Sequence, residues 1–236
     1  MRFHVITLFP ELIEQCTNTS IIGRARQKGL IELYTTCLKD FSTNSYGSVD
    51  DYTYGGGAGM LIECESVYRA YQSAVSNIPA GASVRFIYTT PQGRVFDQNE
   101  AELLSGYDDL VFLCGHYEGV DERVLEELDA ESYSIGDYVL TGGELPAAVM
   151  IDSISRLVPG VLHNKDSAED ESFSGGLLEY PQYTRPVVWR GREVPPILLS
   201  GDHKKVEQYR HLMAVERTKL RRPDMYEDYL KDRGIW

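Results

Sequence analysis

Short apolar runs alternate with amphipathic segments over the first 160 residues of the chain. The apolar runs are rich in β-branched and aromatic residues, and they predict strands at residues 3–9, 31–38, 84–89 and 110–114. Segments with helical periodicity lie between them, at residues 10–28, 63–76, 98–105 and 122–128. This alternation predicts an α/β body with a mostly parallel sheet that is covered on both faces. In such sheets, ligands bind in the crevice beyond the carboxyl ends of the strands.

The pattern changes in the last third of the chain. A long helix is predicted over residues 145–157, and it is closed by Val158, Pro159 and Gly160. A polar, acidic stretch follows and is typical of a mobile linker or lid. Further on, a helix is predicted whose apolar face consists of Val206, Tyr209, Leu212 and Met213. We therefore expect an α/β domain at residues 1–160, a flexible linker at 161–176 and a small helical domain at 177–236.

Composition indicates a globular protein of the cytoplasm. The chain has 236 residues, of which 42% are hydrophobic and 25% are charged, as in ordinary soluble proteins. The apolar stretch at the N-terminus is too short for a signal peptide, and nothing approaches a membrane span. Four cysteines lie far apart without CxxC spacing, which favours reduced, buried thiols: Cys16, Cys37, Cys64 and Cys114.

The net charge of −13 argues against a nucleic-acid partner, because contacts with phosphate need lysine and arginine. The charges are unevenly distributed, however. Residues 1–184 contain 11 basic and 28 acidic side chains, whereas residues 185–236 contain 12 basic and 8 acidic ones. A positive C-terminal segment is compatible with a local RNA contact, and equally with a solvated helix surface.

Glycine-rich segments are the first candidates for chemistry. Residues 54–60 contain Gly55, Gly56, Gly57 and Gly59, but no lysine followed by serine or threonine, so a phosphate-binding P-loop is excluded. This segment is either a flexible turn or a loop that grips an RNA backbone. Three further segments, at residues 90–94, 114–123 and 134–146, are expected at the carboxyl edge of the sheet.

Together, these three segments offer backbone amides, apolar walls and carboxylates. Their only basic residues are Arg94 and Arg123. This combination suits a phosphate-free adenosine ligand that carries a cationic sulfonium, with Glu118 or Asp137 near the positive charge.

Four long motifs in the chain resemble those of bacterial tRNA (guanine-N1)-methyltransferases of the SPOUT class. They are the Gly-His-Tyr-Glu-Gly segment at 115–119 and residues 134–146, 172–186 and 199–203. The resemblance covers essentially the whole chain. It implies methyl transfer from S-adenosylmethionine to N1 of guanine 37, next to the anticodon of tRNA. It also implies a trefoil knot at the cofactor site, and a homodimer in which the linker and C-terminal domain of one subunit act on the site of the other.

The resemblance also assigns site residues by position. The expected cofactor-binding residues are Pro91, Gly115, Tyr117, Glu118, Ser134, Ile135, Gly136, Asp137, Tyr138, Val139, Leu140, Gly142, Gly143 and Pro146. The expected tRNA-binding residues are Gly55, Gly56, Gly57, Gly59, Ser172, Arg185 and His203. A dependence on Mg²⁺ is implied as well, although no metal-ligand spacing is visible in the sequence.

Methylation at N1 requires loss of the N1 proton while negative charge spreads to O6. The resemblance places Arg156 at O6; without it, Arg156 is an arginine favoured by the dipole at a helix C-terminus. The family carries aspartate directly before Ser-Phe, where this chain has Glu171, so Glu171 is the expected base and Asp170 the alternative. On composition alone, both belong to a solvated acidic run. His116 is a second departure, since other members often carry arginine there.

Three rival interpretations remain. Another SPOUT enzyme, methylating a ribose hydroxyl or another base, would share the cofactor loops, but the match at residues 172–186 argues against it. A non-catalytic RNA-binding module would explain the basic tail but not an adenosine-shaped pocket. A nucleotide-dependent dehydrogenase is weaker still, because no GxGxxG follows the first strand.

Overall fold

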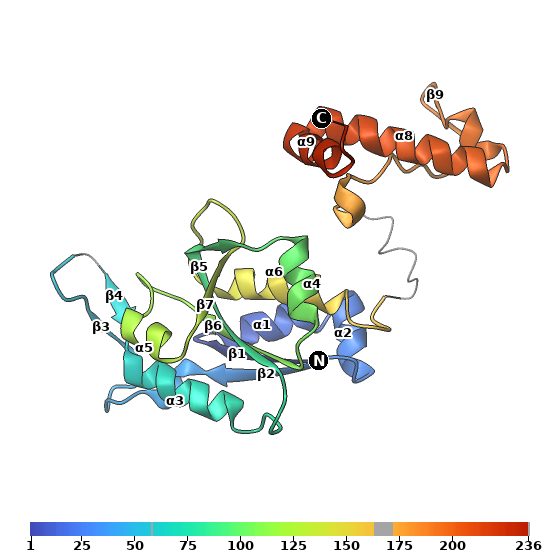
Figure 1. Ribbon diagram of the computed structural model, residues 1–236. Helices are drawn as coiled ribbons and strands as arrows, with labels where there is room; N and C mark the ends of the chain where they lie inside the picture. The colour runs from blue at the N-terminus through green and yellow to red at the C-terminus, as the bar shows by residue number, and fades with distance from the viewer. Residues whose placement is uncertain (58, 163–171, 236) are drawn as a thin grey trace. The chain divides into compact units, whose positions relative to one another are not determined.

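A computed structural model describes residues 1–57, 59–162 and 172–235 of the chain (Figure 1). Its contacts divide the chain into two compact units, Met1–His163 and Asn164–Trp236, which are described separately. Within the described ranges, no helix is long and apolar enough to cross a membrane.

Five strands, all paired in parallel, form the sheet of the first unit in the order β2-β1-β6-β5-β7. Their bounds are Arg2–Thr7 for β1, Glu32–Cys37 for β2, Val84–Val95 for β5, Asp109–Cys114 for β6 and Glu131–Ser134 for β7. All six residues of the central strand β6 are buried. The mostly parallel sheet predicted from the sequence is therefore confirmed, and β7 is an additional strand.

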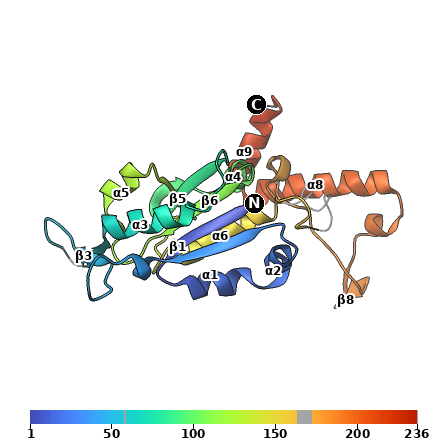
Figure 2. The same ribbon diagram turned by 90° about the horizontal axis from the view of Figure 1, so that it is seen from below.

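Helices cover both faces of this sheet, as predicted (Figure 2). Side chains alternate along β6, so that Leu110 and Phe112 face one core while Val111 and Leu113 face the other. The first core is closed by α1 (Pro10–Thr17), α2 (Ser20–Gln27), α4 (Gln98–Ser105) and α6 (Glu144–Ser155). The second is closed by α3 (Cys64–Val75), α5 (Glu122–Glu127) and the 3-10 turn Leu38–Phe41.

One helical segment differs from the sequence prediction, whereas the glycine-rich segment is a turn, which was one of its two predicted alternatives. The single helix expected at residues 10–28 is two helices, because Asn18 ends α1, Thr19 is extended and Ser20 has a φ of 54°. Asparagine, threonine and serine bond readily to nearby backbone groups, which favours helix ends over helix interiors. The glycine-rich segment is the turn of an antiparallel hairpin formed by β3 (Asp50–Tyr52) and β4 (Met60–Ile62).

A buried polar cluster closes the amino end of the sheet. The carboxylate of Asp109, fully buried at the start of β6, accepts hydrogen bonds from Arg2 Nε at 2.7 Å and Nη2 at 2.6 Å. It also accepts one from His4 Nε2 at 2.9 Å. Burial by itself raises the pKa of Asp109, but the hydrogen bonds from Arg2 and His4 outweigh it, and the pKa is lowered.

The described residues 172–235 of the second unit contain two α-helices, α8 (His203–Arg221) and α9 (Pro223–Asp232), which pack on each other. Asp202 caps α8 by accepting a hydrogen bond from the backbone N–H of Lys205. A short hairpin, β8 (Val188–Trp189) and β9 (Arg192–Glu193), and two 3-10 turns, Ser174–Gly176 and Pro196–Leu199, precede them. The prediction that Leu212 belongs to the apolar, buried face of α8 is wrong, since Leu212 is 55% exposed. The buried positions of this helix are Ala214 and Thr218.

Candidate functional site

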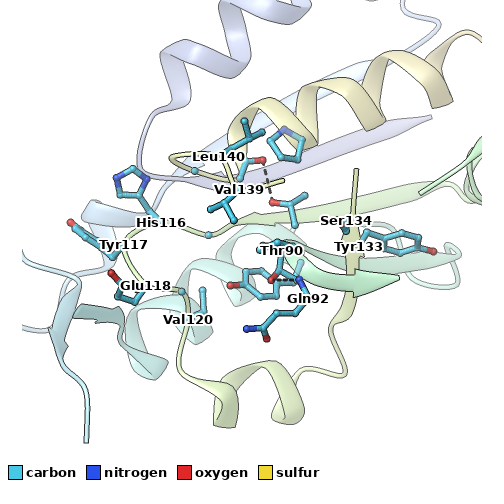
Figure 3. Close-up of a pocket in the computed structure, with 18 of the residues that line it drawn as sticks. Thr90, Gln92, His116, Tyr117, Glu118, Val120, Tyr133, Ser134, Val139 and Leu140 are labelled. Carbon is cyan, nitrogen blue, oxygen red and sulfur yellow. Dashed lines mark hydrogen bonds between the residues drawn. The ribbon is translucent and has the colours of Figure 1, made fainter. Parts of the chain in front are cut away.

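A cavity of about 450 Å³ lies at the carboxyl edge of the sheet, where a bulge in β5 meets the loops after β6 and β7 (Figure 3). Thr90 and Gln92 lie on one side of it, and Val139 and Leu140 on the other. All the residues expected to bind a cofactor line this cavity, except Asp137, which is exposed and does not line it. The lining set is Pro91, Gly115, Tyr117, Glu118, Ser134, Ile135, Gly136, Tyr138, Val139, Leu140, Gly142, Gly143 and Pro146.

A bulge in β5 forms the first wall. Thr89 and Arg94 both pair with Tyr133 of β7, so the residues between them leave the ladder. Thr90, Pro91 and Gln92, which belong to this excursion, line the cavity. The bulge therefore turns a short stretch of an otherwise regular strand into a binding loop.

The second wall is the loop after β6, which has an unusual backbone. Tyr117 has a φ of 57°, a left-handed conformation that non-glycine residues seldom adopt, and Gly119 has a φ of 131°. Two backbone hydrogen bonds to the neighbouring hairpin hold it, from Glu118 N to Met60 O and from Ile62 N to Gly119 O. Burial raises the pKa of the Tyr117 hydroxyl, and the carboxylate of Asp50 raises it further.

The third wall runs from β7 to α6. The Ser134 hydroxyl donates a hydrogen bond to the carbonyl of Gly136, and the exposed Tyr138, Val139 and Leu140 follow. The segment then reaches Gly142 and Gly143, and at the start of α6 the buried Glu144 accepts a hydrogen bond from Thr7 at the end of β1. It therefore runs from the edge strand β7 to the ends of β6 and β1 in the middle of the sheet.

Gly143 belongs to the third wall and forms hydrogen bonds with residues of the other two. Its N–H donates to the carbonyl of Gly115 at 2.8 Å, and its carbonyl accepts from the Thr89 hydroxyl at 3.1 Å. A Cβ at this position would lie 2.2 Å from Thr89 Oγ1 and 2.7 Å from the backbone nitrogen of Gly115. Only glycine fits between these two loops.

The cavity is electrostatically suited to a cation rather than to a phosphate. Glu118 and Glu122 line it, and no described lysine or arginine does. Arg94 pairs instead with Glu131 and Glu100, outside the cavity. Arg123 pairs with Asp121, and the hydrogen bond from its guanidinium holds the pKa of Asp121 well below its usual range.

His116 lines the same cavity on the side of β1. Its ring meets Phe9 edge-on with centroids 5.3 Å apart, and Tyr117 with centroids 5.0 Å apart. The Nδ1 atom is buried and has no hydrogen-bond partner within the described part of the chain. An unpartnered buried nitrogen beside a cavity is available to a ligand.

Sequence reasoning missed several lining residues outside the predicted loops, including Leu61, Tyr88, Thr89, Leu125 and Tyr133. Tyr88 and Thr89 end the predicted strand, so their place at its carboxyl end was an available signal. Leu61 and Val120 come together through an isolated parallel bridge between Ile62 and Val120, which no local pattern predicts.

The remaining predicted residues of the first unit are the four glycines and Arg156. The four glycines belong to the turn between β3 and β4, a loop that projects from the sheet in Figure 1. Of these, Gly59 lies beside the cavity, because a Cβ there would come within 2.3 Å of Cγ of the cavity-lining Glu118. Arg156 caps the C-terminus of α6, ten residues after the cavity-lining Pro146, and a rise of about 1.5 Å per residue puts it roughly 15 Å further along the helix axis. Asp170 and Glu171 lie outside the described residues.

Three of the predicted tRNA-binding residues belong to the second unit. The Ser172 hydroxyl accepts a hydrogen bond from the backbone N–H of Glu179, Arg185 is exposed, and His203 is the first residue of α8. Residues 1–57, 59–162 and 172–235 contain no group of three or more histidine, cysteine or acidic side chains that could hold a metal ion.

Comparison with known proteins gives one consistent answer. A family model described as "tRNA (Guanine-1)-methyltransferase TrmD" matches residues 1–228. A tRNA (guanine-N(1)-)-methyltransferase of Lachnospira eligens is 56% identical over 231 residues, covering 98% of this chain and 97% of the relative. Proteins of the same name from Clostridioides difficile and Staphylococcus epidermidis are each 48% identical, covering 96% and 100% of this chain and 98% and 96% of the relative.

Proposed function

The chain belongs to the tRNA (guanine-1)-methyltransferase family, and on that basis we propose that it transfers a methyl group from S-adenosylmethionine to N1 of guanine 37 in tRNA. The observation that carries the cofactor assignment is the cavity, which has carboxylates and apolar walls but no described cationic residue. A cofactor with a sulfonium and no phosphate fits such a lining. A tRNA substrate places the enzyme in the cytoplasm.

Different residues of the cavity would contact different parts of this cofactor. The apolar side chains of Tyr138, Val139 and Leu140 are exposed in the protein alone, and they supply a wall for the adenine ring. Backbone groups around Gly115 and Gly143 supply hydrogen bonds at close approach. The carboxylate of Glu118, which lines the cavity, would balance the positive charge of the sulfonium. When bound, the cofactor supplies the electrophilic methyl group that the guanine nitrogen attacks.

The return of the chain from β7 to the start of α6 supports the trefoil knot that the resemblance implies. Gly143 lies against the end of β6, and Glu144 bonds to the end of β1, although both follow the edge strand β7 in sequence. We propose that this return threads through the loops after β5 and β6.

Proton removal and charge stabilisation are the remaining tasks. We assign the base to Glu171, with Asp170 as the alternative, and the O6 contact to Arg156. Because Arg156 lies roughly 15 Å along α6 from the cavity-lining Pro146 of its own copy, we propose that a second copy of the chain brings it to the guanine. This supports a homodimer with the active site at the subunit interface. Mg²⁺ is implied by the resemblance only, and no step is assigned to it.

Nucleoside mass spectrometry tests the proposed reaction. Unmodified tRNA is incubated with the protein and S-adenosylmethionine, digested and analysed. We expect N1-methylguanosine to appear, and position 37 to be the modified site. A ribose-methylated nucleoside or another methylated base would favour a different enzyme of the SPOUT class. No modification, together with no binding of S-adenosylmethionine, would favour an RNA-binding module.

Three variants test the base. Glu171→Gln keeps the size of the side chain but removes its basicity, so single-turnover methylation should fall by roughly 10²- to 10⁴-fold. Asp170→Asn should lower the rate much less, and Glu171→Asp, which restores the residue usual in the family, should stay active. If Asp170→Asn is the impaired variant instead, the base is Asp170.

A further inference from the structure

The second unit has a cavity of its own, of about 370 Å³, between residues 180–199 and α8. Two tyrosines, two valines, two leucines and two arginines line it, together with Pro181, Gln182 and Thr184. The lining residues on which the argument rests are Tyr180, Tyr183, Arg185, Val187, Val194 and Arg210. Tyr183 is 48% exposed, so one aromatic ring is accessible from solvent.

Arg210 of α8 is held over one side of this cavity. Its guanidinium carbon lies 4.8 Å from the centre of the Tyr180 ring, a cation–π contact. Its Nε atom is buried and has no hydrogen-bond partner among the described residues. Because a buried donor without a partner is unfavourable, this nitrogen is available to an acceptor on a ligand.

A hairpin rises from the rim of the cavity. Val187 and Val194, at its base, line the cavity and are joined by a backbone hydrogen bond of 2.9 Å. Arg190 and Gly191 form its turn with φ values of 49° and 77°, the pattern of a tight two-residue turn. Trp189, next to the turn, is 58% exposed, and the Arg190 guanidinium lies 5.2 Å from its ring centre.

The surface formed by the cavity and the hairpin is positively charged, whereas the whole chain is negatively charged. Arg185, Arg190, Arg192 and Arg210 lie on it, and Glu193 is the one carboxylate of residues 180–199, whereas the chain carries a net charge of −13. In the part of the chain that the structure describes, none of these arginines forms an ion pair. Guanidinium groups that no carboxylate neutralises attract phosphates.

Accessible aromatic rings interleaved with arginines are typical of surfaces that bind single-stranded nucleic acid, where bases stack on rings and cations contact the backbone. We propose that the cavity binds one unstacked nucleotide of the RNA substrate, with its base against Tyr183 and its phosphate at Arg185. The neighbouring base stacks on Trp189. The proposal rests on the proposed function, because it takes the occupant to be part of the tRNA.

Paired substitutions in the full-length protein test it. Tyr183→Ala removes the stacking ring, and the affinity for unmodified tRNA, measured by fluorescence anisotropy, should fall roughly 5- to 140-fold. Tyr183→Phe keeps the ring and should bind within about twofold of the unchanged protein. Leu212→Ala, a half-exposed position of the same unit outside the cavity, is the matched control and should bind normally. Thermal unfolding of each variant separates loss of binding from loss of fold.

Salt dependence tests the phosphate contact. Arg185→Gln should lower the slope of log affinity against log salt by about one, as expected for one lost phosphate contact. Arg69→Gln, in the first unit, removes an arginine that is already paired with Glu65 and should leave the slope unchanged. If Arg69→Gln lowered the slope of log affinity against log salt as much as Arg185→Gln does, the phosphate assignment would be overturned.

The outcomes separate this inference from the proposed function. If Tyr183→Ala binds tRNA like the unchanged protein while that protein still forms N1-methylguanosine, the cavity does not hold a nucleotide and the enzyme assignment stands. If Tyr183→Phe is as weak as Tyr183→Ala, the hydroxyl rather than the ring is responsible, and stacking is overturned. If the unchanged protein forms no N1-methylguanosine but Tyr183→Ala still loses affinity, the reaction assignment fails and the nucleotide site stands.

Discussion

At the amino end of the parallel sheet, buried Asp109 accepts hydrogen bonds from Arg2 and His4, whereas at the carboxyl end the buried Nδ1 of His116 has no partner among the described residues. The carboxyl end also contains the left-handed Tyr117 and the crowded Gly143. Folding alone favours the first arrangement, because unpaired buried polar groups and strained backbone are both unfavourable. We infer from this difference that the amino end of the sheet stabilises the fold, whereas the carboxyl end binds a ligand.

The strongest way to break the carboxyl end is Gly143→Ala. The new Cβ would meet Thr89 Oγ1 at 2.2 Å and backbone atoms of Cys114 and Gly115 at 2.9 and 2.7 Å, so two loops would have to separate. We expect a loss of about 3 kcal/mol or more in unfolding free energy, and loss of affinity for S-adenosylmethionine. Denaturant unfolding and calorimetry measure the two effects.

Gly106→Ala is the matched control. Gly106 ends α4 with a φ of −79°, and its added Cβ would come no closer than 3.4 Å to another atom, the carbonyl oxygen of Leu103. Both the stability and the cofactor affinity should stay close to those of the unchanged protein. If Gly143→Ala behaves like Gly106→Ala, the loops at the carboxyl end do not approach as closely as described.

Asp109→Asn breaks the amino end instead. The substitution keeps the shape of the side chain but removes the charge that accepts from Arg2 and His4, so unfolding free energy should fall by about 1.5–3 kcal/mol. Cofactor affinity should not change, because Asp109 lies at the opposite end of the strand from the cavity. A smaller loss is expected for Asp108→Asn, a neighbouring exposed carboxylate that accepts from Ser83. A selective loss of cofactor affinity in Asp109→Asn would contradict the division of labour between the two ends.

At acidic pH, the difference in unfolding free energy between Asp109→Asn and the unchanged protein should disappear. The folded-state pKa of Asp109 lies below its ordinary value, which is about 3.9. Its contribution is therefore fully present above that ordinary value and is lost as the pH falls through the lower, folded-state pKa. Unfolding free energies of the two proteins, compared from pH 7 to pH 2, should converge at the acidic end. A gap that stays constant with pH would show that Asp109 does not act through its charge.

Much of the fold could be predicted because the local pattern determines it. The helix at Gln98–Ser105 was predicted with its observed bounds, since Asp97 caps it by accepting from the Glu100 N–H. Strand β7 was not predicted, because only Tyr133 and Ser134 of its four residues are buried. The break between α1 and α2 depends on one residue with positive φ, Ser20, which apolar periodicity does not reveal.

The site was predictable in a different way. Glycines and aromatics after apolar strands indicated three loops at one edge, but the individual residues came from the resemblance. The place of Leu61 depends on a bridge between distant segments, and the place of Thr90 and Gln92 depends on a bulge. Arg94 and Arg123 are the only basic residues of the three predicted loops, and only the structure reveals that both pair with carboxylates and that neither lines the cavity.

Replacing histidine by phenylalanine at each end of the sheet, at His4 and at His116, compares the two ends directly. The change in unfolding free energy at the carboxyl end is the smallest that we expect for a site variant. His4→Phe removes the hydrogen bond to the buried Asp109 carboxylate and should lower the unfolding free energy by about 1.5–3 kcal/mol. His116→Phe keeps a ring against Phe9 and Tyr117 and removes a buried nitrogen that has no described partner, so the unfolding free energy should change by less than about 1 kcal/mol. Denaturant unfolding of both variants at pH 7 measures the difference. Equal losses would mean that Nδ1 of His116 has a structural partner, and the contrast between the two ends would then rest on Tyr117 and Gly143 alone. With stability preserved, a weaker affinity of His116→Phe for cofactor or tRNA identifies the ligand that Nδ1 contacts.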